Sequence, residues 1–405
     1  MDRVILHSDI NSCYASVERL YRPSLEGRPF AVCGSQEARH GIVLAKDETA
    51  KRAGVKTGMA IWQARQLCPE LRIVEPHFDR YAKYSEMVRE IYAEYTDLCE
   101  PFGIDESWLD ITNCLACPDP RRTADEIRRR VKNETGLTVS VGVSWNKVLA
   151  KLGSDYKKPD AVTVIDREHF RSMVWGLPAS DMHMVGRSTR RELARMGIQT
   201  IGELARTDPE LLRLRFGKGG TVLWRYANGL DDSRVRRAGE EEPPQSVGNS
   251  VTLARNIETE RQARETLLML AESVSARLRR QKLRCRTVEV ALRSEELKWT
   301  THRMRLRYAT DVTVSLATCG LELVRHSHDF SSPLHSIGLR ALELVHADED
   351  EQIDIFIDYV NLNKQRSIDA AVDGIRAKYG AESIQRACLL GDPTAANLAF
   401  CSLPD

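Results

Sequence analysis

The stretch CEPFGIDESWLDIT, residues 99–112, is the part of the sequence that decides the fold. Trp108 and Ile111 are among its bulky or β-branched residues, which favour a strand. Asp105 and Glu106 stand side by side in its middle. Because neighbouring residues on a strand point to opposite faces, at least one of the two carboxylates is expected to meet surroundings that disfavour charge. The pair therefore needs a chemical reason to be there.

A second predicted strand supplies another carboxylate. The stretch RVILHSDINS, residues 3–12, is typical of a buried strand that ends at Asp9, and a helix is expected after it. Three carboxylates that converge on one sheet cannot all stay ionised unless cations neutralise them. Such hard oxygen ligands favour magnesium, and two ions about 4 Å apart would suit a phosphoryl or nucleotidyl transfer. On spacing alone, the simpler interpretation is that Asp9 caps a helix and Asp105 and Glu106 mark a strand end.

Composition excludes several classes of protein. The 405 residues predict two to four domains, and contents of 42% hydrophobic and 29% charged residues are typical of a soluble globular chain. No apolar run approaches the roughly 20 residues that cross a bilayer, and the N-terminus lacks a signal-peptide core. Ten cysteines without a disulfide framework predict reduced thiols, and therefore a cytoplasmic protein without a membrane partner. The pair Cys114 and Cys117 has no second pair or histidine at ligand spacing, which makes a zinc site unlikely.

The net charge of +1 hides a basic segment between residues 277 and 307. Three acids, Glu289, Glu295 and Glu296, oppose eleven basic residues, which are Arg277, Arg279, Arg280, Lys282, Arg284, Arg286, Arg293, Lys298, Arg303, Arg305 and Arg307. Such a run is often only a solvated face. Here the stretches RTVEVALRS and THRMRLRY alternate with period two, so one face of a sheet would carry most of the arginines. A basic sheet face suits a phosphate backbone, which makes nucleic acid the leading partner.

Four motifs in order carry a resemblance to a known family: DINSCYASVE, GIDESWLDIT, SVGVSWNKVLAKLGSDYKKPDAVTVI and MVGRSTRRELARMGIQTIGELA. Together they resemble the Y-family DNA polymerases, and within them the bacterial DNA polymerase IV branch, over residues 1 to 346. The resemblance implies an α+β multidomain right hand with a ferredoxin-like palm, small fingers, a helical thumb and an α/β little-finger domain. The implied boundaries are palm 1–31 and 78–165, fingers 32–77, thumb 166–233, linker 234–245, little finger 246–346 and tail 347–405.

The resemblance also assigns the acids. Asp9 and Asp105 would bind both magnesium ions, and the carbonyl of Ile10 would bind one of them. Glu106 would bind the ion that activates the primer 3′-hydroxyl. Two adjacent carboxylates are then useful, because one bridges the ions while its neighbour reaches only the catalytic one.

Nucleotide contacts follow from the same resemblance. Tyr14 matches the steric-gate aromatic, whose ring would clash with a 2′-hydroxyl, and Cys13 beside it is assigned to the same site. Lys158, in KKPD, matches a lysine that contacts the triphosphate, where a point charge is chemically suitable. Without the motifs, Tyr14 would be read as a core residue and Lys158 as an exposed turn residue.

The fingers depart from the family pattern. Where many relatives carry tyrosine-x-x-arginine to grip the triphosphate, the aligned stretch LAKDETAKRAGVKTG has Glu48 and Lys51. Lysine still neutralises phosphate but lacks the bidentate fork of arginine. Glu48 would repel a triphosphate, so it is expected to face away or to pair with Lys46 or Arg52.

Three further segments are predicted to bind DNA or a partner. MVGRSTRRELARMG indicates a helix-hairpin-helix, in which Gly186 permits the turn and backbone N–H groups near Arg187 bind a DNA phosphate. Met184 replaces a common first glycine, which predicts a looser hairpin; a plain helical turn is the alternative. Arg303, Arg305 and Arg307 would share the DNA-facing side of one strand. In the tail, Gln352, Ile353, Asp354, Ile355 and Phe356 resemble the peptide that binds the bacterial sliding clamp, although a short strand or turn fits as well.

Beyond this peptide, Ile368, Val372, Ile375 and Tyr379 form a helical stripe that ends at Gly380. The sequence assigns no function to that helix.

The sequence as a whole predicts a magnesium-dependent, template-directed DNA polymerase specialised for translesion synthesis. Its partners would be primer-template DNA, deoxynucleotides and a sliding clamp, and it would act as a monomer with low processivity and no proofreading. Two alternatives remain. A nucleotide cyclase also uses adjacent carboxylates, but it would not explain the thumb hairpin or the basic domain. A non-catalytic, clamp-recruited DNA-binding scaffold would not need Asp9, Asp105 and Glu106 together.

Overall fold

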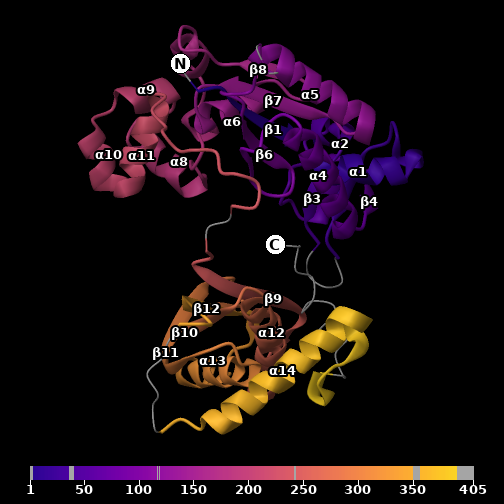
Figure 1. Ribbon diagram of the computed structural model, residues 1–405, viewed down its shortest axis with the longest axis vertical. Helices are drawn as coiled ribbons and strands as arrows, with labels where there is room; N and C mark the ends of the chain where they lie inside the picture. The colour runs from indigo at the N-terminus through magenta and orange to yellow at the C-terminus, as the bar shows by residue number, and fades with distance from the viewer. Residues whose placement is uncertain are drawn as a thin grey trace. The chain divides into compact units, whose positions relative to one another are not determined.

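The computed structural model describes residues 3–35, 41–115, 117, 119–240, 243–349 and 356–389. By its internal contacts the chain forms two compact units. The first consists of Met1–Gly34 and Ile42–Glu241, and the second of Ser35–Gly41 and Glu242–Asp405. Figure 1 traces both units along the chain. Each is described by itself below.

A five-stranded sheet forms the palm in the first unit. The strand order is β5-β6-β1-β7-β8, with β1 antiparallel to both of its neighbours and β8 parallel to β7. The strands are β1 (Ile5–Ile10), β5 (Cys99–Pro101), β6 (Glu106–Asp110), β7 (Val139–Ser144) and β8 (Val162–Val164). Every residue of the central strand β1 is buried, which confirms the buried strand predicted from the sequence.

Helices cover both faces of the palm sheet. They are α1 (Cys13–Tyr21), α4 (Phe78–Ala93), α5 (Pro120–Thr135) and α6 (Lys147–Tyr156). Leu6 and Ile10 of β1 belong to the apolar core that α1, α4 and α5 share, whereas Ile5 packs with Trp108 and Ala150 on the α6 side. Strand alternation then places the side chains of His7 and Asp9 on the α6 side as well. The acidic end of β1 therefore faces α6.

A glycine contact brings α6 unusually close to the sheet. A Cβ atom built on Gly142 of β7 would lie 1.9 Å from the carbonyl oxygen of Ala150 in α6. A Cβ atom built on Gly153 of α6 would lie 3.1 Å from the Cα atom of Gly142. No side chain fits between these backbones. The close approach carries the residues of α6 over β1 and β6, where the acids lie.

The fingers are a small sheet with two short helices. The three strands run in the order β3-β2-β4. The elements are β2 (Phe30–Cys33), β3 (Val43–Lys46), α2 (Glu48–Arg52), α3 (Ile61–Leu67) and β4 (Arg72–Val74). Asp47 caps α2 by accepting hydrogen bonds from the N–H groups of Thr49 and Ala50, and it also accepts one from Phe30 at the start of β2. This fixes α2 to the sheet.

The thumb is helical, as predicted. It contains α7 (Phe170–Val174), α8 (Arg187–Arg195), α9 (Ile201–Arg206), α10 (Pro209–Phe216) and α11 (Lys218–Ala227). Its apolar core also takes Leu149, Leu152 and Ile165 from the palm. The thumb and the palm therefore share buried side chains within one unit.

The stretch expected to be a linker begins as part of the palm. Val235 is buried, and the N–H of Ala238 donates to the carbonyl oxygen of Asp97. Arg236 pairs with the buried Glu100 at 2.9 Å, and Lys147 pairs with the same carboxylate at 2.7 Å. The charged composition of residues 234–245 hid these attachments, because each depends on a partner far away in the sequence.

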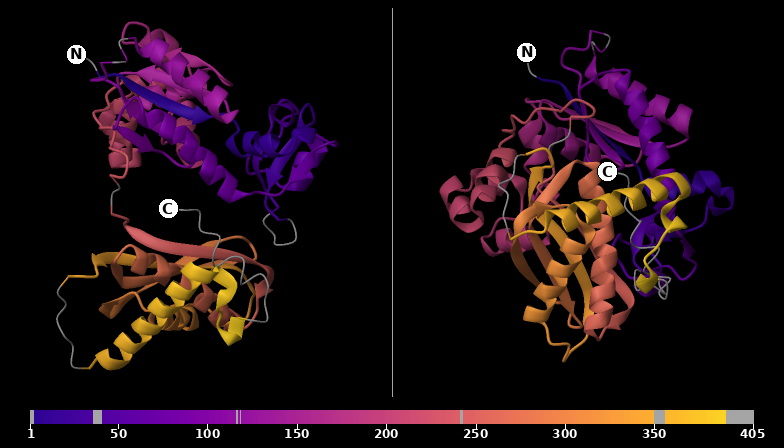
Figure 2. Two further views of the ribbon diagram at one scale, coloured as in Figure 1. Left: turned by 45° about the vertical axis from the view of Figure 1, so that its right-hand side comes forward. Right: turned by 60° about the horizontal axis from the view of Figure 1, so that its bottom comes forward.

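The second unit contains a four-stranded antiparallel sheet in the order β11-β10-β12-β9. Its strands are β9 (Ser246–Ile257), β10 (Leu283–Ser294), β11 (Trp299–Thr310) and β12 (Leu334–His346). The helices α12 (Glu260–Arg280) and α13 (Thr313–Ser327) pack on one face, where they bury an apolar core (Figure 2). The other face of the sheet carries no helix among the described residues.

The tail contains a helix that packs on this unit. Helix α14 (Tyr359–Tyr379) ends at Gly380, which confirms the predicted helix and its end. The predicted apolar stripe, however, is not its packed face: Ile368, Ile375 and Tyr379 are 45%, 38% and 67% exposed, whereas Asp369 is 4% exposed. Asp369 and its neighbour Asp373 pair with Arg279 of α12. The helix is therefore attached through charged groups, and Arg279, one of the eleven basic residues of the segment 277–307, serves this attachment.

No helix in the described part of the chain is long and apolar enough to cross a membrane. The nine cysteines within the described residues are all free thiols, including Cys114 and Cys117.

Candidate active site

The three acids of the sequence analysis meet at one end of the palm sheet. Asp9 at the end of β1 is the register partner of Glu106 at the start of β6. Asp105 immediately precedes β6, and its carbonyl oxygen accepts a hydrogen bond of 2.9 Å from the N–H of Ile10. Asp9 is 7% exposed, and the side chain of Glu106 is 20% exposed. The fold therefore gathers the acids in a largely buried position.

Two lysines neutralise these acids. The Nζ of Lys158 lies 2.7 Å from Asp9 Oδ2 and 2.8 Å from Asp155 Oδ1. Lys151 of α6 pairs with Glu106. Within the described residues no three histidine, cysteine or acidic side chains are arranged to hold a metal ion together. In this arrangement the positive charge at the acids comes from side chains.

Burial disfavours the charged forms of Asp9 and Asp105 despite the nearby lysines. Burial raises the pKa of Asp9 to about 6, against the opposing effect of Lys158 and with a further contribution from Glu106 and Asp105. Burial also raises the pKa of Asp105, and the charge of Glu106 adds to this effect. Burial would raise the pKa of Glu106 too, but hydrogen bonds from His7 and Lys151 lower it to about 2. Two of the three carboxylates would thus gain from a nearby cation.

His7 is a site residue that the sequence analysis missed. Its ring is fully buried, with Nε2 at 3.2 Å from Glu106 Oε2 and Nδ1 at 2.8 Å from Ser154 Oγ. Burial lowers the pKa of His7, so the ring is neutral at pH 7. The only sequence signal was its spacing, since His7 stands two residues before Asp9 and shares its face of the strand.

Tyr14 is held in place by other aromatic rings. It stacks on Tyr81 of α4 with ring centroids 4.2 Å apart and planes 10° apart, and Phe78 meets it edge-on at 5.9 Å. The hydroxyl of Tyr81 donates to Glu18, whose side chain is fully buried. A ring fixed in this way cannot move aside easily. The contact joins α1 to α4, which the motif around Tyr14 could not show.

Cys13 is 4% exposed and packs in the palm core. Its side chain is not available to a nucleotide, so any contact at this position would come from the backbone. Cys13 is the first residue of α1, whose N-terminal N–H groups favour an anion.

The fingers bring lysines toward the palm. Lys51 pairs with Glu48 at 3.2 Å. Glu48 was expected to face away from the triphosphate or to pair with Lys46 or Arg52, and its ion-pair partner among the described residues is Lys51 instead. Lys46 donates to Thr57 Oγ1 at 3.0 Å. Burial lowers the pKa of Lys46, and the positive charges of Lys51 and Lys158 lower it further. Lys46 therefore lies near Lys51 and Lys158. The sequence analysis had not assigned Lys46 to the nucleotide site.

The thumb hairpin is tight despite Met184. Met184 has a φ of 71°, in the left-handed region that favours glycine, and its side chain is 54% exposed. Gly186 has a φ of −78° and is the N-cap of α8, so the turn does not depend on Gly186 as predicted. No side chain caps the helix start at Arg187. The backbone N–H groups at the start of α8 therefore do not donate to a side chain at the N-cap.

The three arginines of the basic strand share a face. Arg303, Arg305 and Arg307 of β11 are all exposed, while Met304 and Leu306 between them pack against the core. Of the proposed clamp-binding peptide, residues 352–355 lie outside the described residues. Phe356 is described and is 82% exposed.

The chain resembles known proteins both in its sequence and in its fold. Residues 8–155 match the impB/mucB/samB family, and residues 244–355 match the C-terminal domain of that family. The chain is 44% identical to the DNA polymerase IV of Acetivibrio thermocellus, over 97% of this chain and 98% of that protein. It is 36% identical to DNA polymerase IV 1 of Bacillus subtilis, over 96% of this chain and 93% of that protein.

Among solved structures, a Y-family DNA polymerase chimera is similar, with a TM-score of 0.75 and 22% identity. The match covers 85% of this chain and 99% of the chimera. At this identity the similarity concerns the fold, and it agrees with the right-hand architecture expected from the sequence.

Proposed function

Because this chain belongs to the impB/mucB/samB family, in the bacterial DNA polymerase IV branch of the Y-family, it is a translesion DNA polymerase, and we propose that Asp9, Asp105 and Glu106 form its metal-dependent catalytic centre. Dependence on divalent metal ions is general in DNA polymerases. The finer assignment is two Mg²⁺ ions, with the carbonyl oxygen of Ile10 as a further ligand. The observation that carries it is the burial of three carboxylates at one end of the palm sheet.

The carboxylate donors of Asp9, Asp105 and Glu106 are chemically suited to divalent cations, although Asp9 and Glu106 pair with lysines here. Oxygen ligands of this kind suit Mg²⁺, which also binds substrate phosphates. When bound, a pair of such ions stabilises both the attacking and the leaving oxygen of an in-line displacement. Lys158 and Lys151 now balance the charge of Asp9 and Glu106. We expect Lys158 to leave Asp9 and to contact the triphosphate together with Lys51. Lys46 is expected to contribute as well, because it lies near both of these lysines.

Titration of Mn²⁺, followed by electron paramagnetic resonance, tests the two-ion assignment. Protein bound to primer-template and a non-hydrolysable deoxynucleotide should bind two ions, and Asp9→Asn should lose at least one because it removes a charged oxygen ligand. Asp110→Asn is the matched control: Asp110 lies at the far end of β6, where it accepts hydrogen bonds from Thr112. Equal binding by wild type and Asp9→Asn would contradict the assignment.

Sugar selection is assigned to Tyr14. Its ring stands on α1, beside Cys13 and within the same palm core as Ile10. The stacked ring of Tyr81 resists displacement of Tyr14. A rigid ring beneath the sugar would exclude a 2′-hydroxyl by a steric clash.

DNA contacts are assigned to the thumb and the little finger. The N–H groups at the start of α8, near Gly186 and Arg187, suit a phosphate. Arg303, Arg305 and Arg307 supply positive charge on the sheet face that carries no helix among the described residues. Neither a nucleotide cyclase nor a scaffold without catalysis needs this whole set, which includes both the acids and the DNA contacts.

Clamp binding is proposed for residues 352–356, and the high exposure of Phe356 supports it. An enzyme of low processivity gains from a tether, because a tether raises its effective concentration at the primer end. Replacing Gln352, Ile355 and Phe356 with alanine should leave synthesis on a short primer unchanged. It should abolish the stimulation that the organism's own clamp gives on a long template.

The control for this experiment is Val360→Ala in α14, which removes an exposed apolar side chain just beyond the peptide. Stimulation of the triple variant to the wild-type level would show that the clamp binds elsewhere. A monomeric state and a cytoplasmic location stay predictions from the sequence.

A further inference from the structure

A buried acid lies in the middle of the basic sheet face. The register of the four-stranded sheet aligns Arg303 of β11, Glu289 of β10, Arg340 of β12 and Gly248 of β9 in one row across the strands. The neighbours of Glu289 along β10 are the fully buried Val288 and Val290, which belong to the core. Glu289 therefore points to the opposite, open face, as do the two arginines beside it.

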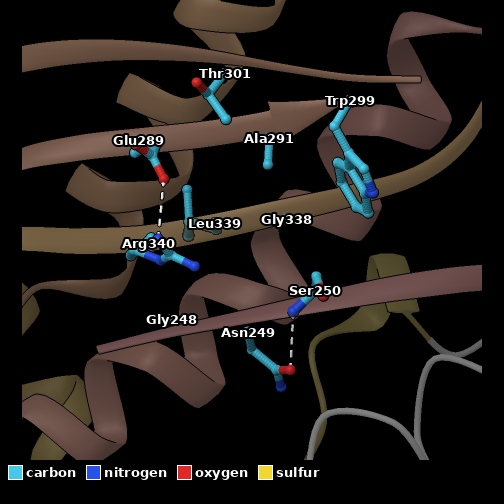
Figure 3. Close-up of a pocket in the computed structure, with 10 residues that line it drawn as sticks. All are labelled: Gly248, Asn249, Ser250, Glu289, Ala291, Trp299, Thr301, Gly338, Leu339 and Arg340. Atoms are coloured by element: carbon cyan, nitrogen blue, oxygen red, sulfur yellow. Dashed lines mark hydrogen bonds and ion pairs between the residues drawn. The ribbon is translucent and has the colours of Figure 1, made fainter. Parts of the chain in front are cut away.

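Glu289 binds both arginines at once. Its side chain is 4% exposed, whereas those of Arg303 and Arg340 are 64% and 54% exposed. Arg303 Nε donates to Glu289 Oε2 at 2.5 Å, and Arg340 Nη1 lies 3.4 Å from Glu289 Oε1 (Figure 3 draws the second contact). Each oxygen of the carboxylate thus serves one guanidinium. The remaining N–H groups of both arginines stay available to solvent or to a ligand.

The neighbouring residues leave room for this arrangement. A Cβ atom at position 248 would lie 2.9 Å from Cγ of Arg340, so the arginine stem needs the glycine. The next row across the sheet has only small side chains, and it forms the floor of a groove of about 430 Å³ beside Arg340 (Figure 3). That row consists of Thr301, Ala291, Gly338 and Ser250. Arg340 and Glu289 therefore line the groove, and Arg303 is attached to it through its ion pair with Glu289.

Electrostatic attraction of DNA does not explain why Glu289 lies on this basic face. A carboxylate on a face that binds phosphate repels the ligand and cancels part of the attraction of the arginines. Its burial is also costly unless it is well paired. A carboxylate between two guanidinium groups does, however, fix their direction, and charge-assisted contacts of this kind are geometrically specific.

We infer that Glu289 is a positioning residue for DNA binding, which holds Arg303 and the groove-lining Arg340 ready to contact phosphates on the basic sheet face. The inference rests on the proposed role of the basic face in DNA binding. It adds Arg340 to the phosphate-binding residues and assigns Glu289 a role that acts only through the two arginines.

The substitution Glu289→Gln separates positioning from charge, because the two effects have opposite signs. Loss of a negative charge alone would tighten the binding of primer-template DNA. Loss of positioning should instead weaken it, by roughly tenfold, and should lower the slope of log K against log salt by about one. The measurement is fluorescence anisotropy with the full chain at several salt concentrations.

Glu343→Gln is the matched control. Glu343 is on the same sheet, its side chain is 55% exposed, and it lies 3.7 Å from Arg305 in a looser contact. Its replacement also removes one negative charge but should tighten binding or leave it unchanged. If Glu289→Gln tightened binding like Glu343→Gln, Glu289 would only be a charge and the inference would be wrong.

A double-mutant cycle distinguishes positioning from a merely structural role. In the background Arg303→Ala and Arg340→Ala, adding Glu289→Gln should not weaken DNA binding further, and the loss of its negative charge should leave the affinity unchanged or raise it. If Glu289→Gln lowered DNA affinity in this background as much as it does when both arginines are present, its role would be structural and the inference would be wrong. Arg340→Lys leaves Glu289 in place and keeps the charge but loses the planar fork, so it should also weaken binding; unchanged binding would contradict the role of Arg340.

One further variant separates this inference from the proposed function on which it rests. Arg303→Ala, Arg305→Ala and Arg307→Ala together should weaken binding and reduce the salt slope. Wild-type affinity and slope in this triple variant would overturn the DNA-binding role of the basic face itself. Weaker binding there, combined with tighter binding in Glu289→Gln, would overturn the positioning role alone.

Discussion

Replacing Glu106 with alanine is expected to lower the rate of nucleotide addition by about 10³-fold or more. Glu106 lies beside Asp9 at the end of the palm sheet, and we assign it to the cation at the primer 3′-hydroxyl. Electrostatic stabilisation by such a centre is commonly the largest contribution to catalysis. Single-turnover primer extension measures the effect, with DNA affinity determined in parallel.

The substitution has a second consequence, because Glu106 also balances Lys151 and contacts His7. Alanine would leave the half-buried Lys151 without this partner, so thermal unfolding must accompany the kinetics. Glu106→Gln keeps the shape and a hydrogen-bond acceptor but loses the charge, and it should be nearly as inactive. DNA binding should persist in both variants, since phosphate contacts are assigned elsewhere. Extension by folded Glu106→Ala protein at near the wild-type rate would refute the assignment.

Replacing Tyr14 with alanine is expected to raise the incorporation of ribonucleotides relative to deoxynucleotides by about 10²-fold. Discrimination by a clash disappears when the bulk that causes it is removed. The ring of Tyr14 cannot simply swing away in the wild type, since Tyr81 stacks on one side and Phe78 meets it edge-on. The ratio of kcat/KM for each ribonucleotide and its deoxy counterpart measures the effect.

Tyr14→Phe is the control, because it keeps the ring and removes only the hydroxyl. It should discriminate as the wild type does. Deoxynucleotide use should change much less than ribonucleotide use in Tyr14→Ala. An unchanged ratio in Tyr14→Ala would place the sugar selection at another residue.

The local pattern of the sequence predicted helix α14 but not the face by which this helix packs. Helix α14 was expected from the apolar stripe at Ile368, Ile375 and Tyr379, and it does end at Gly380. Three of the four stripe residues are exposed and Val372 is half-buried, because Asp369 and Asp373 bind Arg279 of α12 instead. Periodicity reports which residues share a face of a helix, but it does not report what covers that face.

The hairpin in the thumb gives a similar case. The sequence predicted a looser turn because methionine stands at position 184. The structure keeps the tight turn by placing Met184 in the left-handed region, at a cost of about 1–2 kcal/mol for a residue other than glycine. Packing of the surrounding segment decides this: Met182 and Leu193 on either side are buried in the thumb core.

The amino-acid sequence alone identified the family, and it predicted the order of the domains and the three acids, since motifs such as DINSCYASVE and GIDESWLDIT carry them within a few residues. Only the tertiary structure decided which side chains surround those acids. His7, Lys151 and Lys158 reach them because β1, β6 and α6 meet at the close contact of Gly142 with α6. In the same way Glu289 appeared in the sequence as one acid among many arginines, and strand register made it a bridge between two of them. Pairing across strands and helices depends on residues far apart in the chain, and no local pattern of charge or hydrophobicity encodes it.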